Sequence, residues 1–118
     1  MSEPSSSDCL FCRIVAGSIP AEVVAESEHS LAFRDVNPQA PTHVLVVPRR
    51  HVADAGELAA ASADDLADVV RLASRVAELE GLARGHRLVL NTGSGAGQTV
   101  FHAHVHVLGG RDLGWPPG

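Results

Sequence analysis

The sequence predicts an α+β fold with a mainly antiparallel sheet, and three observations support this class. Strand-like runs occur in the order β, β, β, α, β, β, with one long amphipathic helix between them. No internal repeat is visible, and 118 residues are most compatible with one domain. Apolar residues make up 45% of the chain, but it holds only three Phe, one Trp and no Tyr. The core must therefore be built from Val, Leu, Ile and Ala packed between a sheet and a helix.

The N-terminal half predicts a tail, a helical turn and three strands. Residues 1–8 are rich in Ser and predict a disordered tail, so that the domain spans residues 9–118. The stretch CLFCRIVAG predicts a short helix or loop that ends at Gly17. Strand-like runs follow at residues 22–27, 30–35 and 43–47. The segment VNPQAPT between the last two carries two prolines and predicts a loop.

The clearest element is a helix at about residues 63–80. Its apolar side chains repeat every three or four positions, at Leu66, Val69, Val70, Ala73, Val76 and Ala77. Ser62 is the expected N-cap, and Asp64 and Asp65 suit the positive end of the helix dipole. Gly81 is the expected stop. A strand at residues 87–91 and a histidine-rich strand complete the predicted sheet.

Charge and hydropathy exclude several classes of function. The net charge is −5, and no basic stripe interleaved with aromatic residues occurs, so general nucleic-acid binding is not expected. The N-terminus has no basic start followed by an apolar run, and the longest apolar runs have the length of strands. We therefore expect neither a signal peptide nor a membrane span, and we expect a cytoplasmic protein.

Three histidines alternate with apolar residues in FHAHVHVLGG. In a strand, His102, His104 and His106 would share one face, while Phe101, Ala103, Val105 and Val107 would line the other. Three interpretations are open: histidines hydrogen-bonded on a wet sheet face, a metal site built on H-x-H, or a nucleophilic histidine with supporting neighbours.

The glycine-rich segment NTGSGAGQ, which precedes this row, favours the nucleophile. Its glycines do not fit a dinucleotide fingerprint, and a strand follows instead of a helix. Its N–H groups, with the hydroxyls of Ser94 and Thr99, could surround an anion. Neutral imidazole attacks phosphorus near pH 7 when one ring nitrogen is held as N–H by a backbone carbonyl. Such chemistry needs positioning and charge stabilisation rather than a catalytic metal.

Cys9 and Cys12 form a C-x-x-C pair near the N-terminus. A redox dithiol normally follows a strand in a thioredoxin-like unit, and no such strand precedes this pair. Half of a zinc site is favoured instead, with His51 and His102 as candidates for the other two ligands. Two ordinary cysteines near a chain end are the alternative interpretation.

The motif HAHVHVL matches the histidine triad signature, three histidines alternating with apolar residues. The stretches LAFRDVNPQAPTHVLVVPRRH and NTGSGAGQTVFHAHVHVLGGR, together with the terminal WPPG, also resemble the nucleotide-binding branch of the histidine triad (HIT) superfamily. The resemblance covers nearly the whole chain from Cys9. It implies an α+β fold with a five-stranded antiparallel sheet, one long helix and a short N-terminal helix. It also implies a homodimer with a continuous ten-stranded sheet.

The resemblance assigns roles to individual residues. His104 would be the nucleophile that attacks the α-phosphorus, His106 would contact the phosphate and the leaving group, and His43 would assist positioning or proton transfer. Asp35 would accept hydrogen bonds from the ribose hydroxyls. The phosphate loop would be formed by Asn91, Gly97, Gln98 and Thr99. A zinc-binding subset of the family carries one structural zinc per chain on residues that match Cys9, Cys12, His51 and His102, so that His102 would take no part in the chemistry.

The activity that this resemblance implies is hydrolysis of purine nucleoside 5′-phosphoramidates, of the AMP or GMP type, through a nucleotidyl-histidine. A dinucleoside polyphosphate hydrolase of the same fold and a non-catalytic nucleotide-binding regulator are the alternatives. The choice between adenine and guanine would depend on apolar contacts, for example from Phe11 and Ile19. Trp115 would shape the preference for the leaving amine. His29 and His86 have no expected role and are expected at the surface.

Overall fold

A computed structural model describes residues 8–118, so of the predicted tail only Asp8 is included, and residues 1–7 lie outside the described part. The elements in chain order are α1 (Leu10–Val15), β1 (Val23–Glu26), β2 (Ser30–Arg34), β3 (Thr42–Pro48), α2 (Ala55–Ala61), α3 (Ala63–Leu79), β4 (His86–Val89), the 3₁₀ turn η1 (Ser94–Ala96) and β5 (Val105–Gly109). None of the helices within residues 8–118 is long and apolar enough to cross a membrane.

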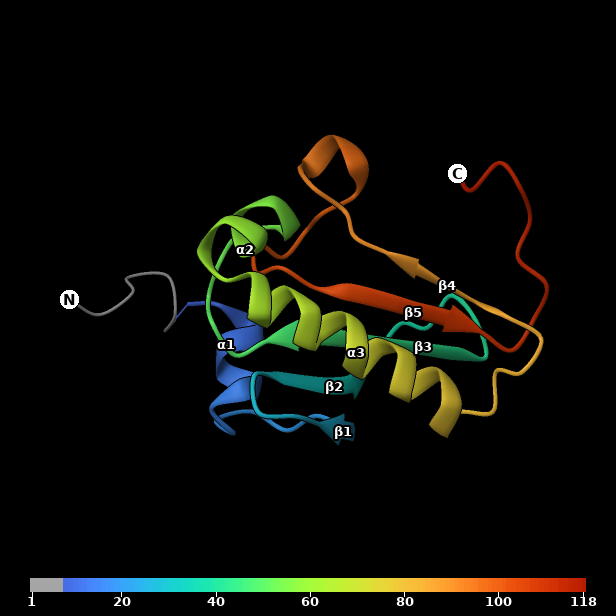
Figure 1. Ribbon diagram of the computed structural model, residues 1–118, viewed down its shortest axis with the longest axis horizontal. Helices are drawn as coiled ribbons and strands as arrows, with labels where there is room; N and C mark the ends of the chain where they lie inside the picture. Colours follow the sequence, from blue (N-terminus) through green and yellow to red (C-terminus); the bar gives the residue numbers. More distant parts are fainter. Residues whose placement is uncertain (1–7) are drawn as a thin grey trace.

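The strands form one five-stranded sheet in the order β1-β2-β3-β5-β4. Every neighbouring pair is antiparallel. The strands after the long helix therefore join the same sheet as the strands before it, with β5 next to β3 and β4 at the edge (Figure 1). This arrangement confirms the predicted α+β class and antiparallel sheet.

Alternating side chains in β2 and β3 build an apolar layer on each face of the sheet. Ala32, Val44 and Val46 belong to one layer, with Val105 and Val107 of β5, and this layer is covered by α3 (Figure 1). Leu31, Phe33, Leu45 and Val47 belong to the other layer, which packs against Phe11 of α1. The histidine strand therefore has α3 beneath one face, which leaves its other face for the chemistry.

The long helix begins and ends where the sequence predicts. Ser62 Oγ accepts the Asp65 N–H at 3.1 Å, which confirms Ser62 as the N-cap. Beyond the last turn Gly81 has a φ of 70°, a conformation that favours glycine. Val70, which was expected on the apolar face, is 39% exposed, so the buried stripe is narrower than the sequence pattern suggests.

Two expectations were wrong. The sequence showed no helix at residues 55–61, yet α2 forms there, capped by Asp54, whose carboxylate accepts the Glu57 N–H at 2.9 Å. The three histidines were also expected on one strand, but β5 begins only at Val105, so His102 and His104 precede it outside the strand. Phe101 does not line the apolar face and is 51% exposed, because the chain enters the sheet only after it.

Candidate active site and metal group

His43, His104 and His106 meet on the face of the sheet opposite α3. His106 lies in β5, His43 lies in the neighbouring strand β3, and His104 lies just before β5. The imidazoles of His104 and His106 have ring centroids 5.0 Å apart. His43 Nε2 lies 2.9 Å from His106 Nδ1, within hydrogen-bond distance. The structure thus brings together the three residues for which a catalytic role is predicted.

His104 is oriented by the main chain. Its Nδ1 lies 2.7 Å from the carbonyl oxygen of His102. A carbonyl can only accept, so Nδ1 carries the proton and Nε2 keeps its lone pair. The edge of Phe11 packs against the ring, with centroids 5.1 Å apart at an interplanar angle of 87°. This is the arrangement that a nucleophilic imidazole requires.

Burial keeps these imidazoles neutral. Burial, together with the nearby imidazoles of His104 and His43, lowers the pKa of His106 to about 4, against the attraction of Asp35. Burial also lowers the pKa of His104, although the carbonyl of His102 and the carboxylate of Asp35 oppose the shift. The pKa of His43 is lowered in the same way, against the attraction of Asp35. Neutral rings near pH 7 are what nucleophilic attack and hydrogen-bond donation need.

A cavity of about 510 Å³ opens beside His104 and His106. It falls in the size range of small-molecule sites. Its apolar walls come largely from α1 and the segment after it, among them Phe11, Ile14 and Ile19. Asp35 and Thr99 add polar groups to the lining. Phe11 and Ile19, the residues expected to contact a base, therefore face the same cavity as the histidines.

The glycine-rich loop folds back on itself beside this cavity. Gly93 and Gly97 have φ values of 88° and 93° around η1, which only glycine adopts readily. Asn91 Nδ2 lies 3.5 Å from His106 Nε2, a long contact. The position of the loop next to the histidines is consistent with the predicted role of its residues in holding a phosphate.

Gln98, one of the four predicted loop residues, is 2% exposed, and its side chain is engaged within the protein. Its Oε1 accepts the Gly93 N–H at 2.8 Å. Its Nε2 donates to the carbonyl oxygens of Ala53, at 2.7 Å, and Val100, at 3.0 Å. Gln98 therefore contributes by fixing the shape of the loop and its attachment to the segment before α2.

A second cluster joins the four predicted metal ligands. Cys12 Sγ lies 3.1 Å from His51 Nδ1 and 3.4 Å from His102 Nδ1, and Cys9 Sγ lies 3.4 Å from the same His102 atom. All four ligand atoms lie within 4.8 Å of one another. Residues from α1, from the end of β3 and from the start of the histidine segment thus converge, as the spacing argument predicted.

The chemistry of this cluster fits a zinc ion. His102 is fully buried, and its Nε2 donates to the carbonyl oxygen of Pro48 at 2.8 Å. Nδ1 therefore keeps its lone pair toward the two sulfurs and His51, and burial lowers the pKa of His102 to about 4. Two thiolates and two imidazoles form a tetrahedral zinc set, and a ligand histidine held by a carbonyl is the usual support for one.

Asp35, His43 and His106 form another group whose ligand atoms lie within 4.8 Å of one another. Its hydrogen bonds disfavour a metal there. The Gln39 N–H donates to His43 Nδ1 at 3.0 Å, so a neutral His43 carries its proton on Nε2. That atom faces Asp35 at 3.3 Å and His106 at 2.9 Å, and a protonated nitrogen cannot bind a metal. We therefore expect no metal in this group, which lies beside the predicted nucleophile His104.

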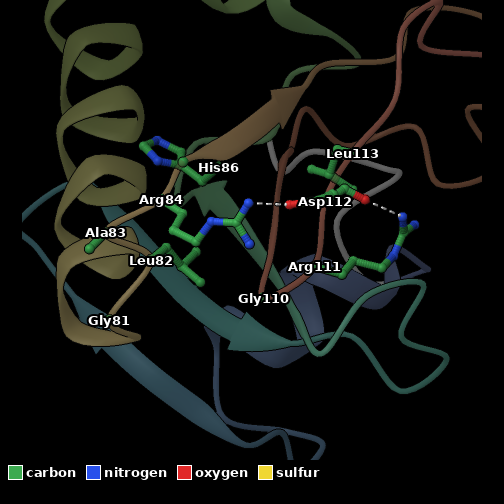
Figure 2. Close-up of a pocket in the computed structure, with 10 residues that line it drawn as sticks. Gly81, Leu82, Ala83, Arg84, His86, Gly110, Arg111, Asp112 and Leu113 are labelled. Carbon is green, nitrogen blue, oxygen red and sulfur yellow. Dashed lines mark hydrogen bonds and ion pairs between the residues drawn. The ribbon is translucent and has the colours of Figure 1, made fainter.

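Another cavity, of about 470 Å³, lies beyond the carboxyl end of β5. Figure 2 shows its lining, in which Arg84 pairs with Asp112 at 2.8 Å. None of the predicted site residues lies in it. Trp115, predicted to shape the leaving-group preference, is 84% exposed in the segment that follows. The histidines therefore single out the cavity beside α1 as the candidate site.

Sequence reasoning expected a backbone carbonyl to hold the N–H of the nucleophilic imidazole, but it did not identify which main-chain groups contact these histidines. The carbonyl oxygens of Pro48 and His102 and the N–H of Gln39 decide which nitrogen of each imidazole carries a proton. A side-chain pattern does not report main-chain direction, so no motif pointed to these groups. The loop that holds Gln39 was recognised only by its two prolines.

Comparison with known proteins decides the family. A family model described as the HIT domain matches residues 16–113 of this chain. The chain belongs to the HIT family. This HIT protein is 47% identical over 113 residues to an uncharacterized HIT-like protein from Synechococcus elongatus, covering 96% of this chain and 99% of that protein.

Solved structures agree with this membership. A HIT family hydrolase from Legionella pneumophila is 50% identical to this HIT protein, with a TM-score of 0.88 over 93% of this chain and 99% of the other. A histidine triad protein from Clostridium difficile is 36% identical, with a TM-score of 0.86 over 97% of each chain. The HIT fold therefore extends over nearly the whole chain.

Proposed function

We propose that this HIT protein is a hydrolase of the histidine triad nucleotide-binding branch that cleaves purine nucleoside 5′-phosphoramidates. The observation that carries the proposal is the state of His104. His104 Nδ1 lies 2.7 Å from the carbonyl oxygen of His102, which keeps the proton on Nδ1 and leaves Nε2 unprotonated. His104 also lines the cavity of about 510 Å³. HIT family hydrolases from Legionella pneumophila and Clostridium thermocellum share the fold at 50% and 44% identity.

This geometry supports the following reaction. His104 Nε2 attacks the α-phosphorus and forms a phosphorus–nitrogen bond, while the bond to the amine breaks and its electron pair stays with the amine. Water then cleaves the nucleotidyl-histidine, which releases the nucleoside monophosphate and frees His104. Over the cycle, water supplies the proton that the amine carries away. His106, with His43 behind it, contacts the phosphate and leaving group, and no step requires a metal.

The nucleotide is placed by the remaining predicted residues. Asp35 accepts hydrogen bonds from the ribose hydroxyls. One of its oxygens already accepts the Asn37 N–H at 2.8 Å, which holds the carboxylate at the mouth of the cavity. Asn91, Gly97, Gln98 and Thr99 form or shape the phosphate seat. A purine base lies against Phe11 and Ile19, the apolar walls of the same cavity.

The decisive test uses an adenosine 5′-phosphoramidate with wild-type protein, His104→Ala and the exposed control His86→Ala. We expect turnover and a nucleotidyl adduct in a mass spectrum after a quench without acid. His104→Ala should lose both, with a rate decrease of roughly a thousandfold or more, while the control keeps them. Tight nucleotide binding without turnover of any substrate would establish a regulatory protein instead. Turnover of a diadenosine polyphosphate alone would establish the polyphosphate hydrolase.

We further propose one structural zinc per chain on Cys9, Cys12, His51 and His102, and a homodimer built around the sheet. The zinc proposal is supported by the convergence of the four ligand atoms within 4.8 Å. The dimer proposal is supported by the edge strand β4, which within the described chain pairs only with β5.

We also propose that residues 9–118 form one domain, because both apolar layers share the strands β2 and β3. A cytoplasmic location is proposed as well.

A further inference from the structure

A main-chain N–H group of a loop contacts His43, one of the histidines of the proposed reaction centre. The main-chain N–H of Gln39, in the loop between β2 and β3, donates to His43 Nδ1 at 3.0 Å. His43 is buried, with 6% of its surface exposed, and so it depends on the protein for hydrogen-bond partners. Because an N–H can only donate, Nδ1 must offer its lone pair, and a neutral His43 carries its proton on Nε2.

The position of the proton on His43 determines the position of the proton on His106. His43 Nε2 lies 2.9 Å from His106 Nδ1 and 3.3 Å from a carboxylate oxygen of Asp35. The shorter contact is to His106, and a protonated Nε2 cannot accept, so the Nε2–H of His43 donates and His106 Nδ1 accepts. A neutral His106 then carries its own proton on Nε2, which lies 3.5 Å from the side-chain amide of Asn91. An amide NH2 group can only donate, so this arrangement requires the Asn91 amide to turn its oxygen toward His106. His104 and His106, both on the cavity, thereby present opposite groups to a substrate: a lone pair from His104 and an N–H from His106.

We propose that Gln39 is a positioning residue of the reaction centre, whose main-chain N–H sets the direction of the His43–His106 hydrogen bond so that His106 offers an N–H donor to the substrate phosphate and leaving group. The inference rests on the proposed function. It adds the group that decides which of the two histidines on the cavity, His104 or His106, donates a hydrogen bond to the substrate.

The position of Gln39 is itself secured from the C-terminal segment. Arg111 Nη2 donates to the Gln39 carbonyl oxygen at 3.1 Å. Gly110 allows this approach, because a Cβ at that position would lie 2.8 Å from the Pro41 side chain. On the other side, the Gln39 side chain donates to the Asn37 carbonyl oxygen at 3.0 Å. Arg111 is thus a second positioning residue, which acts through the loop.

The first test reads the histidine tautomers directly. In ¹⁵N-labelled, metal-loaded protein near pH 7.5, long-range ¹H–¹⁵N correlation should show His43 and His106 protonated on Nε2 and His104 protonated on Nδ1. Gln39→Pro removes the N–H, and we expect a second tautomer of His43 to appear. Gln39→Ala keeps the N–H and should keep the wild-type tautomer.

The second test measures phosphoramidate hydrolysis. We expect kcat of Gln39→Pro to fall roughly tenfold, as for the loss of one neutral hydrogen bond, with a smaller change in KM. Arg111→Ala should also lower kcat, by severalfold. Arg84→Ala is the matched control. Arg84 lines the same cavity of about 470 Å³ as Arg111 and pairs with Asp112 (Figure 2), whereas the hydrogen bond to the Gln39 carbonyl comes from Arg111. It should leave kcat unchanged.

Wild-type His43 protonated on Nδ1 would overturn the inference, whatever the variants do. So would folded Gln39→Pro and Arg111→Ala proteins with wild-type tautomers and wild-type kcat. If circular dichroism shows that Gln39→Pro does not fold, the wild-type tautomers and the Arg111→Ala rate decide the matter. Wild-type protein with the expected tautomers but no hydrolysis would contradict the proposed function and not the hydrogen-bond direction.

Discussion

At the scale of single residues, each histidine of the site is distinguished by the partner of its second nitrogen. His102 donates to the Pro48 carbonyl and turns Nδ1 toward the cysteines. His104 donates to the His102 carbonyl and turns Nε2 outward. His43 accepts from Gln39 and therefore donates to His106. One main-chain contact thus distinguishes the histidine proposed as a metal ligand, the one proposed as the nucleophile and the one proposed as a donor.

The lowered pKa values of these histidines predict a pH profile. The pKa of His104 lies below its ordinary value of 6.5, chiefly because of burial. As the pH falls through 6.5, His104 therefore stays neutral and keeps its lone pair, and it is protonated only at lower pH. We expect the acidic limb of kcat/KM, which reports the free enzyme, to have its midpoint below 6.5. A midpoint at or above this value would contradict the buried, neutral nucleophile.

The lowered histidine pKa values also predict that folding stability decreases as the pH falls. His43 and His106 bind protons less readily in the folded protein than in the unfolded chain, and the pKa of His106 is lowered from 6.5 to about 4. Between these two values the unfolded chain binds more protons, so folding stability should fall as the pH decreases through this window. Urea unfolding at pH 7.5 and at pH 5 measures the difference, and His43→Ala should reduce it.

At the scale of elements, α1 connects the metal group to the reaction centre. Cys9 stands at its N-cap and Cys12 lies in its first turn. Phe11, between them, packs against Phe33 with ring centroids 5.5 Å apart and against His104 at 5.1 Å. A metal held by the two cysteines therefore also fixes the aromatic wall of the cavity.

Removal of one thiol tests this connection. We expect Cys9→Ala to lose zinc and to lower Tm by about 10 °C or more, because tight metal binding stabilises only the folded state. Nucleotide affinity should weaken as well, since Phe11 loses its support. Arg13→Ala, an exposed position of the same helix, is the control. Less than half a zinc per wild-type chain, with an unchanged Tm in Cys9→Ala, would rule the site out.

The elements predicted correctly are those with a strong local signal. The long helix combines a repeating apolar face with Ser62 at its start and Gly81 at its end. Helix α2 has no such face, because Leu58 is its one buried side chain and the rest of AGELAAA is Ala, Gly and Glu. The start of β5 was missed because the alternation of histidines and apolar residues continues through His102 and His104, which lie before the paired strand. The four ligands of the metal group could be predicted from the sequence, whereas the main-chain groups that contact the histidines could not.

At the scale of the whole molecule, the two faces of the sheet carry different parts of the protein. One face packs against α3 and supplies the larger apolar cluster, while the other face carries α1, the cavity and both histidine groups. The sheet has open edges at β1 and β4 within residues 8–118. A homodimer that continues the sheet must use one of them, and we expect β4, which lies beside the histidine strand.

Two matched edge variants test this assembly. Light scattering at micromolar concentration should give about twice the chain mass of 12.3 kDa for the wild type. Leu90→Lys, at a 40% exposed position after β4, should shift the protein toward the monomer. Val23→Lys, at a 50% exposed position of β1, should leave the dimer intact. A wild-type mass near that of one chain would exclude the dimer, and a monomer produced by Val23→Lys alone would move the interface to β1.

The exposed C-terminal segment also determines how the protein can be followed optically. The chain holds one Trp and no Tyr, and Trp115 is 84% exposed. We expect its emission in the folded chain to be that of a solvated indole, so unfolding of the core should change the fluorescence very little. A partner subunit or an amine that covers WPPG should instead shift the emission to shorter wavelength. The native protein thus carries its own fluorescent reporter for events at its C-terminus.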